Sequence, residues 1–129
     1  MNNQDQIERH SELPIFVLWM DFLKWLLIKT GKFPKKARFT FSNRIDNLAL
    51  DIVEQIIEAR YSRSKLLILN KINVDLEKLR ILFRISYESR FLSLESYKHG
   101  IKKINEVGQM LGGWMKNRKA FDETNKPSL

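Results

Sequence analysis

The chain has 129 residues, of which 43% are hydrophobic, a size and composition typical of one folded domain rather than of a disordered segment. Lys and Arg number 23 against 15 Asp and Glu, which gives a formal net charge of +8. Such a surplus points to an anionic partner, which can be a nucleic acid, an anionic membrane or an acidic protein surface. The sequence contains no cysteine, so disulfides, zinc–thiolate sites and thiol nucleophiles are excluded.

The first predicted helix follows a polar N-terminal segment. Residues 1–12 show no apolar periodicity and no secretory signal, so we expect a flexible arm. The helix is predicted over residues 14–30, with Pro14 in its first turn. Asp21 and Lys24 interrupt its apolar stretch, which also falls short of the roughly 20 residues that a membrane span needs. We therefore expect a buried helix of a cytoplasmic protein that makes no membrane contact.

Apolar side chains occupy almost the whole circumference of this first helix. A bundle of four helices covers only one stripe of each member, so a helix that is apolar on every side needs additional cover. Loops or the N-terminal arm could supply it, or a second copy of the chain could pack there. We favour the second copy and expect a homo-oligomer.

Two further helices, over residues 41–62 and 65–91, are predicted from apolar residues that recur at spacings of three and four. Either Ser42 or Thr40 is expected to cap the first of them. The break at residues 62–64 is long enough only for an antiparallel return.

The last predicted helix opens with Ser93 as its N-cap and continues to about residue 119. Gly108 lies on its apolar seam. A glycine inside a helix costs roughly 0.5–1 kcal/mol relative to alanine, so we expect this one to admit a bulky neighbour or a close helix. No segment shows the alternation of a strand. The prediction is an all-α, up-down antiparallel four-helix bundle over residues 13–119, followed by a flexible C-terminal tail over 120–129.

Residues with catalytic or metal-binding chemistry are sparse. Neither histidine, His10 or His99, stands three residues after a glutamate, which is the spacing of di-iron bundles. Asp51, Glu54 and Glu58 line one helix face, which we interpret as a solvated face paired with basic neighbours rather than a metal site. We predict a protein that is not an enzyme and has no cofactor or metal.

Basic residues form the candidate binding site for an anionic partner. Residues 29–44 include many Lys and Arg but no Asp or Glu. Arg80 and Arg84 stand about one helical turn apart, and the planar arginine fork suits phosphate or carboxylate. The alternative is that these two pair with acids of their own helix, namely Asp75, Glu77 or Glu88. The candidate residues are Lys35, Lys36, Arg38, Arg60, Arg63, Arg80 and Arg84.

The sequence shows no aromatic residue that is recognisably exposed within a basic motif. We therefore expect recognition of nucleic-acid backbone and shape rather than reading of bases.

Three stretches are similar to a known family: Phe-Pro-Lys-Lys at 33–36, Leu-Arg-Ile-Leu-Phe-Arg at 79–84, and the segment that ends in Gly-Gly-Trp at 106–114. Over about residues 16–118 the chain resembles the accessory variability determinant (Avd) proteins of diversity-generating retroelements. That family shares a four-helix fold with proteins encoded by intervening sequences in bacterial ribosomal RNA genes.

The resemblance implies a bacterial, non-catalytic homopentamer. It would bind the reverse transcriptase of the retroelement and its template RNA or DNA, and so support mutagenic reverse transcription. Under this resemblance Arg80 and Arg84 match helix arginines of the family, and Lys35 and Lys36 match its basic loop. The alternatives are a bundle of the ribosomal intervening-sequence type and a helical scaffold that binds an acidic protein partner.

Overall fold

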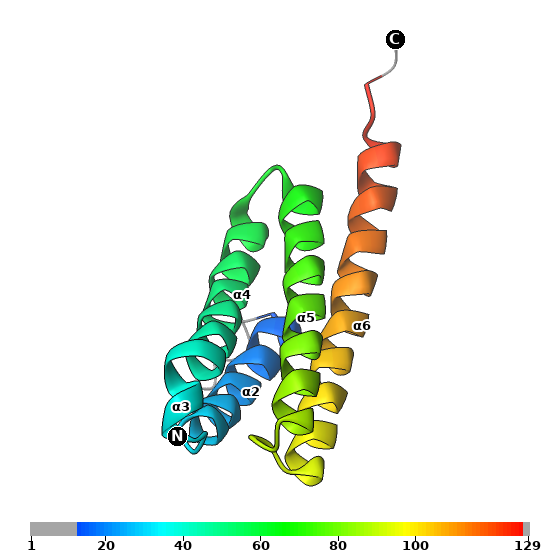
Figure 1. Cartoon of the computed structure of the whole chain (residues 1–129). Coiled ribbons are helices and arrows are strands. Elements are labelled where there is room, and N and C mark those ends of the chain that lie inside the picture. Colours follow the sequence, from blue (N-terminus) through cyan, green and yellow to red (C-terminus); the bar gives the residue numbers. More distant parts are fainter. Residues whose placement is uncertain (1–12, 128–129) are drawn as a thin grey trace, which may run out of the picture.

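The structure, a computed structural model, describes residues 13–127, and every regular element in this range is helical (Figure 1). Four long helices make up most of it: α2 (Pro14–Thr30), α4 (Asn43–Tyr61), α5 (Lys65–Glu88) and α6 (Leu94–Thr124). The predicted all-α four-helix bundle is confirmed. The arm expected over residues 1–12 lies outside the described residues.

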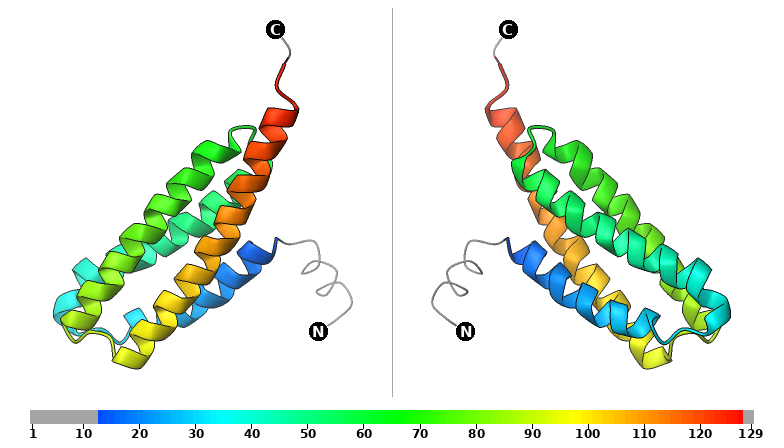
Figure 2. Two further views of the ribbon diagram at one scale, coloured as in Figure 1. Left: turned by 90° about the vertical axis from the view of Figure 1, so that its right-hand side faces the viewer. Right: turned by 90° about the vertical axis from the view of Figure 1, so that its left-hand side faces the viewer.

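Successive long helices run in opposite directions (Figures 1 and 2). α4 packs on α5 and α5 on α6, while α2 closes the bundle by contacting both α4 and α6. Between α2 and α4 lie a short helix, α3 (Lys35–Ala37), and a π-helical turn, η1 (Arg38–Ser42). Within the described part of the chain, no helix is long and apolar enough to cross a bilayer.

The C-terminal ends of α5 and α6 differ from the prediction for local reasons. α5 stops at Glu88 rather than residue 91, because the backbone turns into the left-handed region at Arg90 (φ 66°) and the Phe91 N–H donates back to the Ser86 carbonyl. α6 continues to Thr124 rather than ending near residue 119. An Arg118–Asp122 ion pair of 2.9 Å, one turn apart, supports these added residues.

The predicted cap of α6 is confirmed, but those proposed for α4 are wrong. Ser93 Oγ accepts from the Ser96 N–H at 3.1 Å. Ser42 Oγ instead donates to the Thr30 carbonyl at 3.0 Å, and Thr40 Oγ1 to the Ala37 carbonyl at 3.4 Å. The chain is already helical through α3 and η1, so α4 does not begin with free N–H groups that a side chain must cap.

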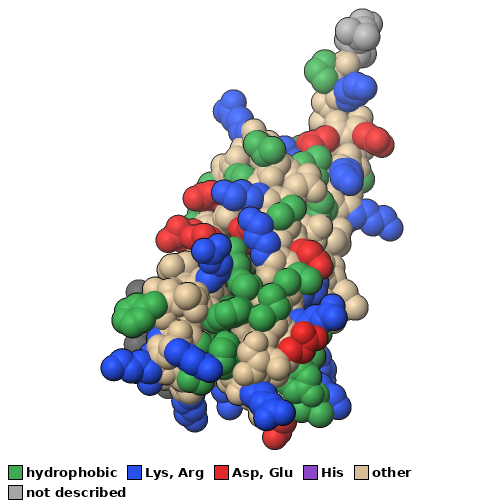
Figure 3. All heavy atoms as spheres, viewed as in Figure 1, with side chains coloured by type: hydrophobic (Ala, Val, Ile, Leu, Met, Phe, Trp, Pro, Cys, Tyr) green, Lys and Arg blue, Asp and Glu red, His purple; other side chains and the backbone are tan. Residues whose placement is uncertain are grey.

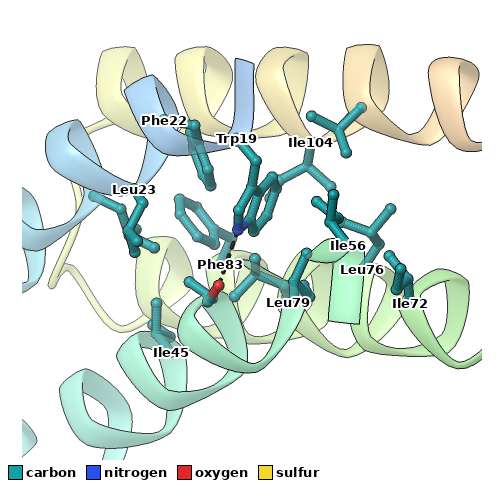
Figure 4. Packing of buried hydrophobic residues seen from close by; sticks show 14 of the residues in the cluster. Trp19, Phe22, Leu23, Ile45, Ile56, Ile72, Leu76, Leu79, Phe83 and Ile104 are labelled. Atoms are coloured by element: carbon teal, nitrogen blue, oxygen red, sulfur yellow. Dashed lines mark hydrogen bonds between the residues drawn. The ribbon is translucent and has the colours of Figure 1, made fainter. Parts of the chain in front are cut away.

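Trp19 of α2 lies at the centre of the core, and its indole N–H donates to the Ala49 carbonyl of α4 at 2.9 Å (Figure 4). Buried apolar residues from all four long helices pack around it (Figure 4). Leu27 and Ile28, on the other side of α2, remain exposed in the single chain. The other apolar residues of α2 are buried or half-buried within the single chain, so cover by a second copy remains a prediction.

Two glycines of α6 allow close packing against α5. A Cβ on Gly108 would lie 3.0 Å from Nη2 of Arg80, so the expected bulky neighbour is this guanidinium. A Cβ on Gly100 would collide with the ring of Phe83, a contact that the sequence analysis did not predict. Because neither glycine has a side chain, α6 can lie close to α5 at both positions.

Candidate nucleic-acid interface

The structure separates the predicted binding residues instead of gathering them into one site. α3 and η1 lie at one end of the bundle, and the α4–α5 connection lies at the other (Figure 1). The predicted residues therefore fall into three groups: Lys35, Lys36 and Arg38 at the first end, Arg60 and Arg63 at the second, and Arg80 and Arg84 along α5.

The end formed by α3 and η1, here called the basic end, is anchored by aromatic packing. Phe33 is buried and lies 5.8 Å, centroid to centroid, from Phe91 in the α5–α6 connection. Phe33 points into the bundle, and Lys35 and Lys36, which follow it in the chain, are exposed to solvent. Neither lysine forms an ion pair with a carboxylate of residues 13–127. Arg38 donates from Nε to the Phe33 carbonyl at 3.3 Å, which fastens it to the same loop.

Arg90 adds a further exposed cation to the basic end, because the neighbouring Phe91 packs against Phe33. Its φ of 66° is in the left-handed region, which costs an L-residue about 1–2 kcal/mol. Such strained positions are often found at functional sites. Arg90 is not among the residues predicted from the sequence, because only the fold brings the α5–α6 connection beside α3.

Arg80 and Arg84 make the ion pairs of the alternative prediction. Arg80 binds Glu77 at 3.1 Å and donates from Nε to Asn105 of α6 at 2.9 Å. Arg84 binds Glu88 at 3.0 Å, and this hydrogen bond and charge raise the pKa of Arg84 above its usual value. Water screens ion pairs at a surface, so such pairs contribute little to stability. A stronger anion can therefore displace them.

Basic side chains at the opposite end close helix termini. Lys65 Nζ donates to the carbonyls of Ala59 and Arg60, both at 2.7 Å, and so caps the C-terminus of α4. Arg118 Nη2 of α6 donates to the Arg63 carbonyl at 3.4 Å. These contacts give Lys65 and Arg118 a structural role. The predicted residues Arg60 and Arg63 contribute only backbone carbonyls to them, and the guanidinium of Arg60 lies 5.7 Å from the ring centroid of Tyr61.

Phe39 of η1 contradicts the expectation that no exposed aromatic residue lies within a basic motif. Its side chain is 81% exposed. It borders a hollow of about 320 Å³ that is also lined by Asn43, Arg44 and Asn47. Its exposure could not be predicted from the sequence, because a regular 3.6-residue period does not describe a π-helical turn.

A larger apolar groove adjoins this hollow between α4 and α5, and the two share Arg44 and Leu82. Its volume is about 690 Å³, and Val74 and Ile81 of α5 lie along it. Figure 3 shows the hydrophobic patch on this face of α4 and α5, with Lys, Arg, Asp and Glu around it. Leu67 extends the exposed stripe along α5, at the same seven-residue spacing that separates Val74 from Ile81. Such a spacing is typical of a seam that packs on another helix.

The described residues offer no metal site. No group of three or more His, Asp or Glu in residues 13–127 is arranged to hold an ion. Asp51, Glu54 and Glu58 are exposed, as predicted for a solvated face. They form no ion pair with other described residues, so the predicted pairing is wrong.

Comparison with known proteins identifies the family. A search of curated proteins finds no match. A family model described as bAvd-like matches residues 16–118. This is the family of accessory proteins that the sequence resembles, and it is generally non-catalytic. Because the matched range covers most of the chain and the fold is the expected bundle, the protein belongs to the bAvd-like family.

Proposed function

We propose that the protein is a non-enzymatic accessory subunit of a diversity-generating retroelement, which binds the template RNA and the reverse transcriptase to support mutagenic reverse transcription. Membership of the bAvd-like family supports the accessory role. The observation that carries nucleic-acid binding is the basic end, where exposed lysines and Arg90 have no carboxylate partner among the described residues.

Unpaired cations favour the basic end as the principal phosphate contact. Binding there breaks no internal ion pair, and each phosphate that is neutralised releases condensed counterions. Arg80 and Arg84 would first have to leave Glu77 and Glu88. We assign these two arginines to the reverse-transcriptase surface along α5, as secondary contacts for RNA or DNA.

Exposed apolar surface supports assembly and protein binding. Leu67, Val74 and Ile81 form a second seam on α5, opposite its core-facing side, and Leu27 and Ile28 are uncovered on α2. Two separate apolar surfaces on one chain suit a ring in which different faces meet. We propose a homopentamer, the assembly that the family resemblance implies.

Salt-dependent RNA binding by a paired-lysine variant tests this function. Lys35→Ala/Lys36→Ala is compared with Lys98→Ala/Lys102→Ala, which removes two exposed lysines one turn apart on α6 and leaves the same net charge of +6, from 8 − 2. Each lost phosphate contact lowers the slope of log K against log salt by about 0.7–0.9, so the first variant should lose about 1.5. The control should retain nearly all of the parent slope.

Equal slopes for the two variants would refute the placement of RNA at the basic end. Light scattering on the RNA-free protein tests the pentamer separately, and a monomer would refute it. Co-purification with the reverse transcriptase, with nuclease present, tests the polymerase contact. Loss of that contact in Arg80→Ala/Arg84→Ala with unchanged helical content would support the assignment to α5.

A helical scaffold for an acidic protein is the second candidate, and the groove between α4 and α5 favours it. This groove places Arg44 and Lys78 beside the apolar Val74 and Ile81, and the Glu77 carboxylate in its lining is paired with Arg80. An amphipathic helix with acidic flanks would fit such a surface. If the protein binds its polymerase but no RNA, this candidate replaces the first.

A further inference from the structure

We propose that the hollow beside Phe39 binds an unpaired nucleobase of single-stranded RNA or DNA. This inference rests on the proposed function and adds a base-binding subsite to its basic end. It replaces the expectation of recognition by backbone and shape alone.

The local helix geometry separates two neighbouring aromatic residues. Phe41 is half-buried against Phe91, with ring centroids 5.6 Å apart and planes at 64°. Phe39, on the same π-helical turn, faces solvent and is the most exposed of the large hydrophobic residues in the described chain. One ring therefore fixes the turn while the other is free to stack. π-helical turns are frequent at functional sites for this kind of local reorientation.

The rest of the lining supplies hydrogen-bonding groups. Asn43 and Asn47 present side-chain amides, and neither amide hydrogen-bonds to another residue of 13–127. Thr40 adds a hydroxyl, and Arg44 adds a cation. No carboxylate lines the hollow. Its volume of about 320 Å³ is at the lower end of the roughly 300–1,000 Å³ of small-ligand sites.

An unpaired base matches each of these features. Its π-face can stack on Phe39, and its polar edge can pair with the asparagine amides. Its flanking phosphates can reach the exposed cations of α3 and η1, which immediately precede the hollow in the chain. An apolar helix from a protein partner would bury the asparagine amides without partners, which is costly. A base inside a duplex has no free face, so the subsite selects single strands.

Fluorescence anisotropy with a single strand and a duplex of equal phosphate number tests the subsite. Base stacking on an aromatic side chain is lost on truncation, so Phe39→Ala should bind the single strand about 5- to 150-fold more weakly. Its affinity for the duplex should stay within about twofold of the parent. Phe39→Trp should retain single-strand affinity, and the added indole fluorescence should be quenched on binding. Phe121→Ala removes another exposed phenyl, 54% exposed on the far part of α6, and should change neither affinity.

Several results would overturn the proposal. Unchanged single-strand affinity of Phe39→Ala, or an equal loss for single strand and duplex, would exclude stacking at Phe39 while RNA binding by the parent still stood. Phe39→Ala could also keep its RNA affinity but assemble to a lower mass or fail to co-purify with the polymerase. Either result would show that Phe39 contacts protein. If the parent binds neither nucleic acid, both the subsite and the proposed function fail.

Discussion

Substituting alanine at two glycines of α6 should change stability in opposite directions. A Cβ at Gly100 would lie 3.0 Å from Cδ1 and 3.2 Å from Cζ of Phe83, and closer still to Cε1. Carbon atoms normally approach to about 3.5–4.0 Å. Phe83 is fully buried and packs against Phe22 with ring centroids 6.3 Å apart, so its ring has little room to move. Gly100→Ala must therefore displace either the ring or the helix.

The magnitude follows from two opposing effects. Overpacking a core costs about 1–3 kcal/mol, and the upper half of that range applies because Phe83 is enclosed. Alanine regains about 0.5–1 kcal/mol over glycine in a helix. Gly100→Ala should therefore destabilise the protein by about 1–2.5 kcal/mol. At Gly112 a Cβ would meet nothing within 4 Å, so Gly112→Ala should stabilise it by about 0.5–1 kcal/mol.

Urea denaturation followed by circular dichroism measures both effects. With a denaturant slope of about 2 kcal/mol/M, the midpoint should fall by about 0.5–1.3 M for Gly100→Ala and rise by about 0.3–0.5 M for Gly112→Ala. All variants are compared at one protein concentration, because association stabilises by mass action. In a Phe83→Leu background the cost of Gly100→Ala should shrink. A midpoint for Gly100→Ala at or above that of the parent would refute the reasoning.

Three further substitutions, the last with a matched control, test local features of the fold. Arg90→Gly should stabilise by about 0.5–1 kcal/mol, because glycine removes the strain of a φ of 66°; an unchanged or lower melting temperature would contradict this. Burial raises the pKa of Asp46 above its ordinary 3.8, and a hydrogen bond from a threonine hydroxyl only partly opposes the shift. The folded-state pKa is thus the higher one, so ionised Asp46 destabilises the fold increasingly as pH rises from about 3.8 to the folded value. The melting temperature of Asp46→Asn minus that of the parent should therefore grow across this pH interval and then level off. A difference that does not change with pH would contradict this prediction. Trp19→Phe should cost about 2–3 kcal/mol in urea denaturation, since it leaves a cavity and removes the bond to the Ala49 carbonyl, whereas Trp25→Phe at a half-buried site should cost less than about 1 kcal/mol.

Local periodicity and helix-end chemistry were sufficient to predict the bundle. The bounds of α2 match the prediction, and the N-cap at Ser93 is where the sequence placed it. These features depend on residues within a few positions of each other, which is why the sequence reports them directly. Gly108 was recognised as an anomaly for the same reason, but its neighbour, Arg80, became known only from the packing of α5 on α6.

The binding surface depends on contacts between distant segments, which local patterns do not encode. The basic end forms because Phe33 and Phe41 both pack on Phe91, far along the chain. The exposure of Phe39 follows from a π-helical turn that shifts the helix phase. Composition and periodicity thus determined a basic, all-α bundle, because charge and helix phase are properties of the chain itself. The tertiary structure alone decided which cations are paired and which aromatic ring faces solvent, because those outcomes depend on what each side chain meets across the fold.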